Sequence, residues 1–298
     1  MASAHPTILL TGAAGQLGRE LAAALPAVGN VVACDRAMLD LADPAAIAAR
    51  VRAIAPRVIV NAAAYTAVDR AETDREAAFA VNAHAPGVLA EEARRANALL
   101  IHYSTDYVFD GERTTPYDES APVHPVNAYG QSKLAGERAI AASGAAALTL
   151  RTSWVYARHG QNFLVAMQRL ATRQRELRVV DDQTGVPNWT RSLAQATTRL
   201  VGQGVGHLVE CAGLYHLSAQ GATTWYGFAR AILEENRDVR VTPITTADYP
   251  TPARRPRYGV LDATRFARVF GFALRDWQTL LHECLHSPPE PARTQPVH

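Results

Sequence analysis

A tyrosine and a lysine stand four residues apart in the segment NAYGQSKLAGE, which spans residues 127–137. In a helix, Tyr129 and Lys133 lie on the same face, one turn apart. A phenol has an unperturbed pKa of about 10, and a neighbouring cation lowers that pKa because it favours the phenolate. The spacing fits a tuned acid, but taken alone it favours a tyrosine and a lysine on a solvated helix face.

A second group of polar side chains follows the short apolar run LLIHYS at residues 99–104. Ser104, Thr105 and Asp106 stand at the end of this predicted strand, and ligands of open α/β sheets bind beyond the carboxyl ends of the strands. A hydroxyl there can donate a hydrogen bond to a carbonyl oxygen that Tyr129 protonates. Taken alone, Thr105 is more typical of a turn or a helix cap.

A glycine-rich segment, TGAAGQLG at residues 11–18, follows the first predicted strand and begins a helix. Gly12 allows a tight turn, Gly15 lets a diphosphate approach the backbone, and Gly18 lets the helix pack closely against the sheet. The helix N-terminus supplies free N–H groups and a partial positive charge for phosphates. These features predict a dinucleotide site.

The choice of dinucleotide depends on the end of the second predicted strand. Asp35 can bond the ribose hydroxyls of an adenosine, which favours NADH, whereas the adjacent Arg36 can pair with the 2′-phosphate of NADPH. We therefore expect NADPH or NADH as the cofactor. The predicted cofactor contacts are Gly12, Gly15, Gln16, Leu17, Gly18, Asp35, Asp40, Leu41, Ala63, Ala64, Tyr65, Tyr129 and Lys133.

The elements that position these residues alternate regularly through the first half. Apolar runs at 7–11, 31–35, 57–61, 99–104 and 147–151 predict strands, and the segments 15–25, 44–54, 75–96 and the one beginning at Tyr129 predict helices. Alternation of this kind predicts a doubly wound parallel sheet. Because the strands are almost continuously apolar, both faces of the sheet should be covered.

The regular alternation of predicted strands and helices ends after residue 152. Helical patterns at 162–173, 192–201, 224–236 and 274–285 are separated by loops and by the short apolar runs 177–180 and 214–218. We expect a dinucleotide-binding domain over 1–152, a smaller α+β region that mainly binds substrate over 153–286, and a disordered tail over 287–298.

Composition excludes several other classes of protein. The 298 residues are 48% hydrophobic and 19% charged with a net charge of +2, which argues against a dominant nucleic-acid surface. The cysteines Cys34, Cys211 and Cys284 match no metal-ligand spacing and fit reduced thiols. The N-terminus lacks a signal peptide or membrane span, so we expect a cytoplasmic protein without a metal site or a membrane partner.

Taken together, these segments resemble the extended short-chain dehydrogenase/reductase family, and within it the dTDP-4-dehydrorhamnose reductases. The resemblance covers nearly the whole chain and rests on GQLG, NAAAYTAVDRAE, IHYSTDYVFDG, YGQSKLAGE, RTSWVY, DDQTGVP, GLYHL, TTWYGFA and YPTPARRP. It implies a Rossmann-like fold and reduction of the C4 ketone of dTDP-4-dehydro-L-rhamnose to dTDP-L-rhamnose. This reaction is the last step in making that nucleotide sugar.

The resemblance also implies residue roles. Thr105, Tyr129 and Lys133 become the catalytic set. The implied substrate contacts are Ser104, Thr105, Asp106, Tyr107, Trp154 and, as a partner for the diphosphate, Arg255. An arginine suits that last role because its planar fork bonds two phosphate oxygens at once. The same residues also fit an arginine that lies on the surface of a proline-rich loop and binds nothing.

Other functions on the same fold stay open at this stage. A 4,6-dehydratase carries Asp-Glu after its threonine, whereas Tyr107 follows Asp106 here. An epimerase is harder to separate, and a non-catalytic regulator similar to the β subunit of methionine adenosyltransferase is a further alternative. Some relatives join subunits through magnesium-binding glutamates. Glu20 occupies one such position, but Arg191 occupies another, so we expect a monomer or a homodimer without a metal bridge.

Overall fold

A parallel sheet of six strands forms the centre of the computed structural model, which describes residues 5–236 and 238–287. The strands are β1 (Thr7–Thr11), β2 (Asn30–Cys34), β3 (Val58–Asn61), β4 (Leu99–Thr105), β5 (Ala147–Thr152) and β10 (Gly213–His216). They lie in the order β10-β5-β4-β3-β1-β2, and each neighbouring pair is parallel. The predicted doubly wound parallel sheet is confirmed.

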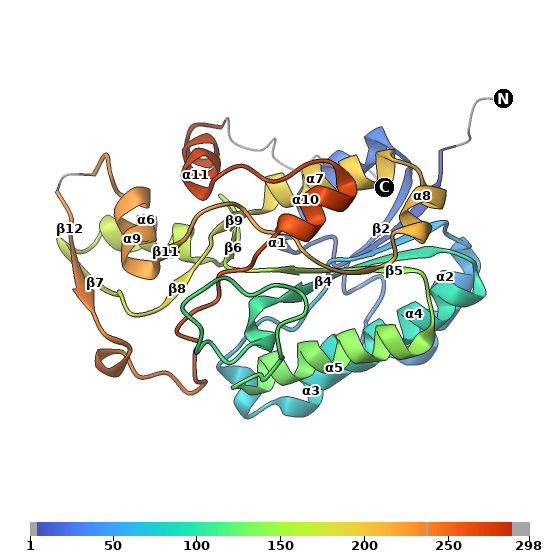
Figure 1. The fold of residues 1–298 in the computed structure, drawn as a ribbon, viewed down its shortest axis with the longest axis horizontal. Coiled ribbons are helices and arrows are strands. Elements are labelled where there is room, and N and C mark those ends of the chain that lie inside the picture. Colours follow the sequence, from blue (N-terminus) through green and yellow to red (C-terminus); the bar gives the residue numbers. More distant parts are fainter. Residues whose placement is uncertain (1–4, 237, 288–298) are drawn as a thin grey trace.

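Helices cover both faces of this sheet (Figure 1). One face carries α1 (Gln16–Ala24), α7 (Thr190–Gly202), α8 (Val205–Glu210) and α10 (Thr264–Phe270), and the other carries α2 (Pro44–Ile54), α4 (Ala85–Arg95) and α5 (Ala128–Ser143). Successive strand side chains point to opposite faces. Accordingly Ile8 belongs to the first core, with Leu21 and Leu200, whereas Leu9 belongs to the second, with Leu89.

The long helix predicted over 75–96 is interrupted. It begins as α3 (Arg75–Phe79), passes through a π-helical turn at Ala80–His84 and continues as α4. The turn presents Asn82, whose Oδ1 accepts a hydrogen bond from the backbone N–H of Tyr65 at 2.8 Å. A π-turn within a helix is frequent at functional sites, and this one fixes the loop that follows β3.

A smaller lobe lies beside one end of the sheet and has its own core (Figure 1). Its elements are β6 (Val155–Tyr156), α6 (Phe163–Ala171), β7 (Glu176–Val180), β8 (Thr184–Gly185), β9 (Asn188–Trp189), β11 (Thr223–Thr224), α9 (Trp225–Ile232), β12 (Arg240–Ile244) and α11 (Trp277–His286). Leu164, Phe228 and Trp277 pack together inside it. This lobe stands where the smaller α+β region is expected.

Residues after 152 contribute to the core of the smaller lobe and also to the first core of the main sheet, since β10, α7, α8 and α10 return to that sheet. The division at residue 152 stays a prediction. The expected disorder of 287–298 falls outside the described residues, apart from Ser287. Within the described residues, no helix combines the length and the apolar character that a membrane crossing requires.

Candidate active site

Two glycines at the junction between β1 and α1 stand where no side chain fits. Gly12 has a φ of +71°, and a Cβ on it would lie 2.6 Å from the backbone nitrogen of Ala63. A Cβ on Gly18 would lie 2.0 Å from the carbonyl oxygen of Gly12. Gly15 precedes α1 and offers no side chain to cap it, so the first N–H groups of the helix remain available to an anion. This cradle fits a dinucleotide diphosphate.

The two residues after Gly15 have different surroundings. Gln16 reaches across to the chain that follows β6, where its Oε1 accepts a hydrogen bond from Asn162 at 2.7 Å. Its Nε2 donates to the carbonyl oxygen of Gln161 at 3.3 Å. The side chain of Leu17, in contrast, packs in the core. Gln16 therefore connects the glycine loop with the smaller lobe.

The residues expected to select the cofactor lie beyond β2. Oδ1 of Asp35 accepts hydrogen bonds from the backbone N–H groups of residues 37 and 38 at 3.0 and 3.1 Å. Arg36 has an 86% exposed side chain and faces Asp40 at 3.7 Å, while Leu41 is buried. The Asp35 carboxylate and the exposed Arg36 guanidinium thus stand next to each other beyond β2, and their predicted roles toward the cofactor stay predictions.

The loop after β3 supplies the other predicted cofactor contacts. Ala63, Ala64 and Tyr65 are half-buried there, at the carboxyl end of the sheet. The phenol of Tyr65 donates to Oδ2 of Asp74 at 3.1 Å, and partial burial together with this carboxylate raises its pKa. The backbone of Ala63 lies close to Gly12, so this loop and the glycine loop meet at the strand ends, where the sequence predicts the cofactor.

Thr105 and Tyr129 meet inside the protein, although 24 positions separate them in the sequence. Thr105 ends β4, Tyr129 lies in the first turn of α5, and the Thr105 side chain lies close enough to the phenol to influence its pKa. Burial raises the pKa of Tyr129 well above its usual range, and the nearby Thr105 hydroxyl opposes that rise. The phenol therefore keeps its proton at neutral pH, as a proton donor must.

Lys133 lies one turn further along α5 and is 2% exposed. Its Nζ donates to the carbonyl oxygen of Tyr103 at 2.6 Å and faces Nε2 of His102 at 3.3 Å. Burial lowers its pKa to about 8, against an opposing attraction from Glu137. The lowering of the Tyr129 pKa by Lys133 that we expect from the spacing stays a prediction.

Three more of the predicted substrate contacts lie near Thr105 and Tyr129. Asp106 is fully buried, which raises its pKa to about 7 although hydrogen bonds from Thr105 and the backbone oppose the shift. The ring of Tyr107 meets that of Tyr129 edge-to-face with 5.5 Å between their centres. The hydroxyl of Ser104 is buried and has no hydrogen-bond partner among the described residues. An unpaired hydroxyl of this kind suits a polar ligand.

Trp154 forms part of an aromatic stack at the junction with the smaller lobe. Its φ of +41° lies in the left-handed region, which is rare for a bulky residue and typical of functional sites. The ring stacks on Trp225 with 3.5 Å between centres and 8° between planes. Gly185 provides the space, because a Cβ there would lie 2.4 Å from the Trp154 ring. A flat apolar wall results, of the kind that packs against sugar rings.

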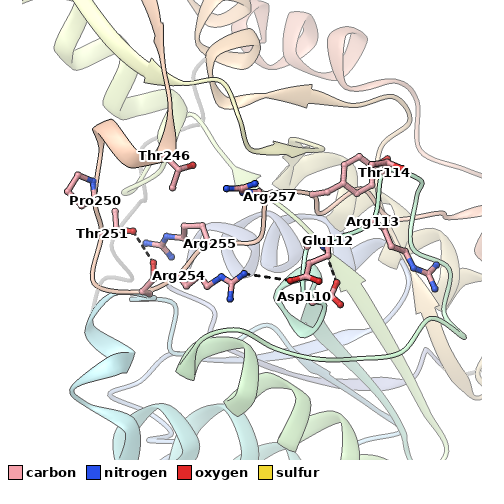
Figure 2. Close-up of a pocket in the computed structure, with 13 residues that line it drawn as sticks. Asp110, Glu112, Arg113, Thr114, Thr246, Pro250, Thr251, Arg254, Arg255 and Arg257 are labelled. Carbon is pink, nitrogen blue, oxygen red and sulfur yellow. Dashed lines mark hydrogen bonds and ion pairs between the residues drawn. The ribbon is translucent and has the colours of Figure 1, made fainter.

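Arg255 lines a cavity of about 810 Å³ between the loop after β4 and the loop before α10 (Figure 2). Its guanidinium pairs with Asp69 at 2.8 Å and lies 6.0 Å from the centre of the Tyr107 ring. Arg254 and Arg257 line the same cavity. Asp110 and Glu112 also line it, and Arg254 faces Glu112 at 3.7 Å, so the lining carries both charges with arginine in excess.

The described residues contain no group of three or more His, Cys, Asp or Glu side chains that could hold a metal ion. Glu20, on α1, accepts a hydrogen bond from Nε of Arg191, on α7, at 3.1 Å. The side chain of Glu20 is 8% exposed, and its carboxylate faces a guanidinium of the same chain. This contact agrees with the expectation that no metal bridges subunits here, which stays a prediction.

Sequence reasoning missed several residues of this site. His102 and Asn61 lie in segments that were predicted only as buried strands, with no role in the site. Trp225 was predicted only as part of a helix. A usable signal was present in the composition. Of the 30 basic residues, Lys133 is the single lysine and all others are arginines. Because arginine does not lose its proton in proteins, Lys133 offers the single titratable side-chain ammonium of the sequence.

The parallel sheet, the glycine loop and the buried Thr-Tyr-Lys set together define an NAD(P)-dependent oxidoreductase of the extended short-chain dehydrogenase/reductase class. A family model described as the RmlD substrate binding domain matches residues 6–288. The chain belongs to this family, the dTDP-4-dehydrorhamnose reductases.

Relatives and solved structures agree with this assignment. The dTDP-4-dehydrorhamnose reductase of Burkholderia thailandensis is 46% identical over 290 residues, which cover 93% of this chain and 97% of the relative. The enzyme of the same name from Escherichia coli is 43% identical over 282 residues, covering 91% and 94%. A crystal structure of dTDP-4-dehydrorhamnose reductase from Bacillus anthracis in complex with NADP superposes with a TM-score of 0.88 at 34% identity, covering 94% and 98%.

Proposed function

We propose that this protein reduces the C4 ketone of dTDP-4-dehydro-L-rhamnose to dTDP-L-rhamnose with NADH or NADPH. The observation that carries the proposal is the buried contact between the Thr105 hydroxyl and the Tyr129 phenol beyond the carboxyl end of β4. The nicotinamide supplies the hydride when it is bound. The names of the relatives support the choice of substrate.

The side chains divide the remaining chemistry. As hydride reaches C4, negative charge grows on the carbonyl oxygen, and Thr105 donates a hydrogen bond to it. Tyr129, which burial keeps protonated, transfers its proton to that oxygen and becomes a phenolate. Lys133, one turn away, stabilises this phenolate through its charge. General acid catalysis of this type contributes about 10²–10⁴-fold to a rate.

We assign the substrate contacts as the sequence predicts. The Trp154 ring packs against the sugar, and Ser104, Asp106 and Tyr107 bond its hydroxyl groups near the reacting carbon. The unpaired hydroxyl of Ser104 and the aromatic stack support these roles. Arg255 bonds the diphosphate, and Asp69 holds its guanidinium in place.

For the cofactor, we propose that NADH is accepted at least as well as NADPH. Oδ2 of Asp35 bonds a ribose 2′-hydroxyl and repels a 2′-phosphate, whereas the exposed Arg36 attracts that phosphate. Replacing Asp35 with alanine should therefore raise kcat/KM for NADPH relative to NADH. A wild type that strongly prefers NADPH, with no gain in Asp35→Ala, would show that Arg36 dominates.

We also propose that the protein acts in the cytoplasm, as a monomer or as a homodimer without a metal bridge. The ion pair between Glu20 and Arg191 supports the second part, because a cation does not ligate a cation. Sedimentation with and without a chelator measures the assembly, and cell fractionation measures the location. Dissociation of a dimer by the chelator would contradict the absence of a bridge.

Two incubations test the reaction itself. With dTDP-4-dehydro-L-rhamnose and NADH, the protein should produce dTDP-L-rhamnose. With dTDP-glucose and NAD it should form no keto-sugar, because Tyr107 stands where a dehydratase carries its second acid. Dehydration of dTDP-glucose would assign the chain to the dehydratases, and inertness in both incubations would favour a regulatory role.

A further inference from the structure

A row of buried polar side chains crosses three neighbouring strands behind the catalytic helix. Thr11 of β1 is in register with Asn61 of β3, and Asn61 is in register with His102 of β4. Lys133 of α5 is the fourth member of the row and lies next to His102. All four residues are at most 2% exposed, so each polar atom has to find its partner within the row or the adjacent backbone.

The amide of Asn61 has one defined orientation. Its Oδ1 accepts hydrogen bonds from the Thr11 hydroxyl at 2.7 Å and from the backbone N–H of Ala63 at 3.2 Å. A backbone N–H only donates, so the atom that faces it has to be the oxygen. The amide nitrogen of Asn61 consequently faces Nδ1 of His102, at 3.0 Å, and donates to it.

This orientation decides which nitrogen of His102 carries the proton. Burial holds the pKa of the imidazole well below its usual range, so the ring is neutral and has one N–H. Nδ1 accepts from Asn61, and the proton therefore lies on Nε2. Nε2 faces Nζ of Lys133 at 3.3 Å. An imidazole N–H bonds well to the lone pair of a neutral amine and poorly to an ammonium, which has no lone pair.

We propose that His102 is a positioning residue that favours the uncharged amine of Lys133, so that this lysine exchanges its proton readily during turnover. The role of this proton exchange in catalysis rests on the proposed reaction. Tyr129 loses its proton to the substrate oxygen at each turnover. The Lys133 ammonium returns a proton to the phenolate, becomes an amine that accepts a hydrogen bond from His102, and regains its proton from solvent.

The other groups around Lys133 do not replace this effect. Burial itself favours the neutral amine, and Glu137, one turn later on α5, favours the ammonium. Glu137 is already engaged by Arg151 of β5, with 2.6 Å between charged atoms. Asp106 lies on the Thr105 side of Tyr129, and Tyr103 contributes only its carbonyl oxygen, which accepts from either form of the lysine. Of the two groups that the structure places within hydrogen-bond distance of Nζ, His102 is the one whose contact differs between the ammonium and the amine.

Because Lys133 is the single lysine of the sequence, its titration can be followed directly. Full-length protein labelled with [ε-¹³C]lysine, without a lysine in any tag, gives one lysine resonance whose chemical shift reports the protonation of Nζ. The experiment compares wild type with two variants. His102→Gln can turn a carbonyl oxygen toward the ammonium. Asn61→Asp presents only acceptors, so His102 has to move its proton to Nδ1 and offer a lone pair to Lys133.

Both variants should raise the midpoint of the Lys133 titration by about one pH unit or more, a tenfold change in proton affinity. The alkaline fall in the rate of ketone reduction should move upward by the same amount. His216→Gln is the matched control, since His216 is a second buried imidazole, on β10, and should leave the titration unchanged.

An unchanged midpoint in His102→Gln and Asn61→Asp, with cofactor binding and thermal melting retained, would overturn the proposal. So would an equal shift in the His216→Gln control. A shifted resonance in a protein that reduces no ketone would leave the role of His102 intact and refute the proposed reaction instead. The two failures are therefore distinguishable.

Discussion

The Thr105 hydroxyl has one proton, and in this structure it donates that proton to Oδ1 of Asp106 at 3.1 Å. It also accepts from the backbone N–H of Tyr107 at 3.2 Å. To bond a substrate carbonyl, Thr105 has to turn its proton away from Asp106. The Asp106 pKa of about 7 makes this easier at neutral pH, because a protonated carboxyl group attracts the hydroxyl less strongly than a carboxylate does.

Replacing Asp106 with asparagine should change how stability depends on pH. The carboxyl group titrates near pH 4 when unfolded and near 7 when folded. Because the folded pKa is raised, its contribution to stability is complete below about pH 4 and is lost as the pH rises through about 7. The unfolding free energy of Asp106→Asn should therefore exceed that of wild type increasingly across this window. Denaturant titrations at several pH values measure the difference, and a constant difference would contradict the burial argument.

Tyr129→Phe keeps the ring and removes the acid. Turnover should fall by about 10²–10⁴-fold, the usual contribution of a general acid. Cofactor affinity should stay nearly unchanged, because the glycine loop and α1 are untouched. Steady-state kinetics and a cofactor-binding titration check both statements, and a variant with retained turnover would remove Tyr129 from its role.

At the scale of elements, the catalytic helix is placed by a close contact with the π-turn. A Cβ added to Gly136 of α5 would lie 2.1 Å from the carbonyl oxygen of Asn82. Gly136→Ala should therefore push α5 away from the turn, lower the unfolding free energy by about 1–3 kcal/mol and reduce turnover. Gly206→Ala in α8 is the control, since its Cβ would meet nothing within 4 Å. Equal unfolding free energies of the two variants would show that α5 and the π-turn move apart without loss of stability.

Periodicity located most elements because their signals are local. The run TILLT coincides with β1, and the segment beginning at Pro44 coincides with α2. Helices α8 and α10 and strand β12 were not predicted from the periodicity. Strand β12 contains a proline and two polar residues, and it forms through pairing with β7, about 60 positions earlier. The π-turn was missed because it depends on how Asn82 packs against α5.

The same distinction applies to the site. Thr105, Tyr129 and Lys133 were predictable because their spacing and order are visible along the chain. Trp225 was not, because its stacking on Trp154 joins segments that only the fold brings together. The link between His102 and Lys133 likewise depends on the register between β3 and β4, which periodicity does not supply.

For the whole molecule, we expect activity without a divalent metal. The Glu20–Arg191 pair already neutralises the carboxylate at the surface between α1 and α7. Dialysis against a chelator should leave the rate of ketone reduction unchanged, as measured with NADH and with NADPH. A large loss that magnesium restores, and that Arg191→Ala alters, would show that this surface binds a metal.

The sixth strand of the sheet has a consequence for how the chain is made. Strand β10 covers the edge of β5 but is translated about 60 residues later, and α10 follows later still. A nascent chain that ends near residue 152 therefore exposes an unpaired strand edge and an apolar sheet face that only α1 covers, both of which promote aggregation. A gene fragment truncated there should yield insoluble protein, and the ribosome has to deliver most of the polypeptide before the sheet can close.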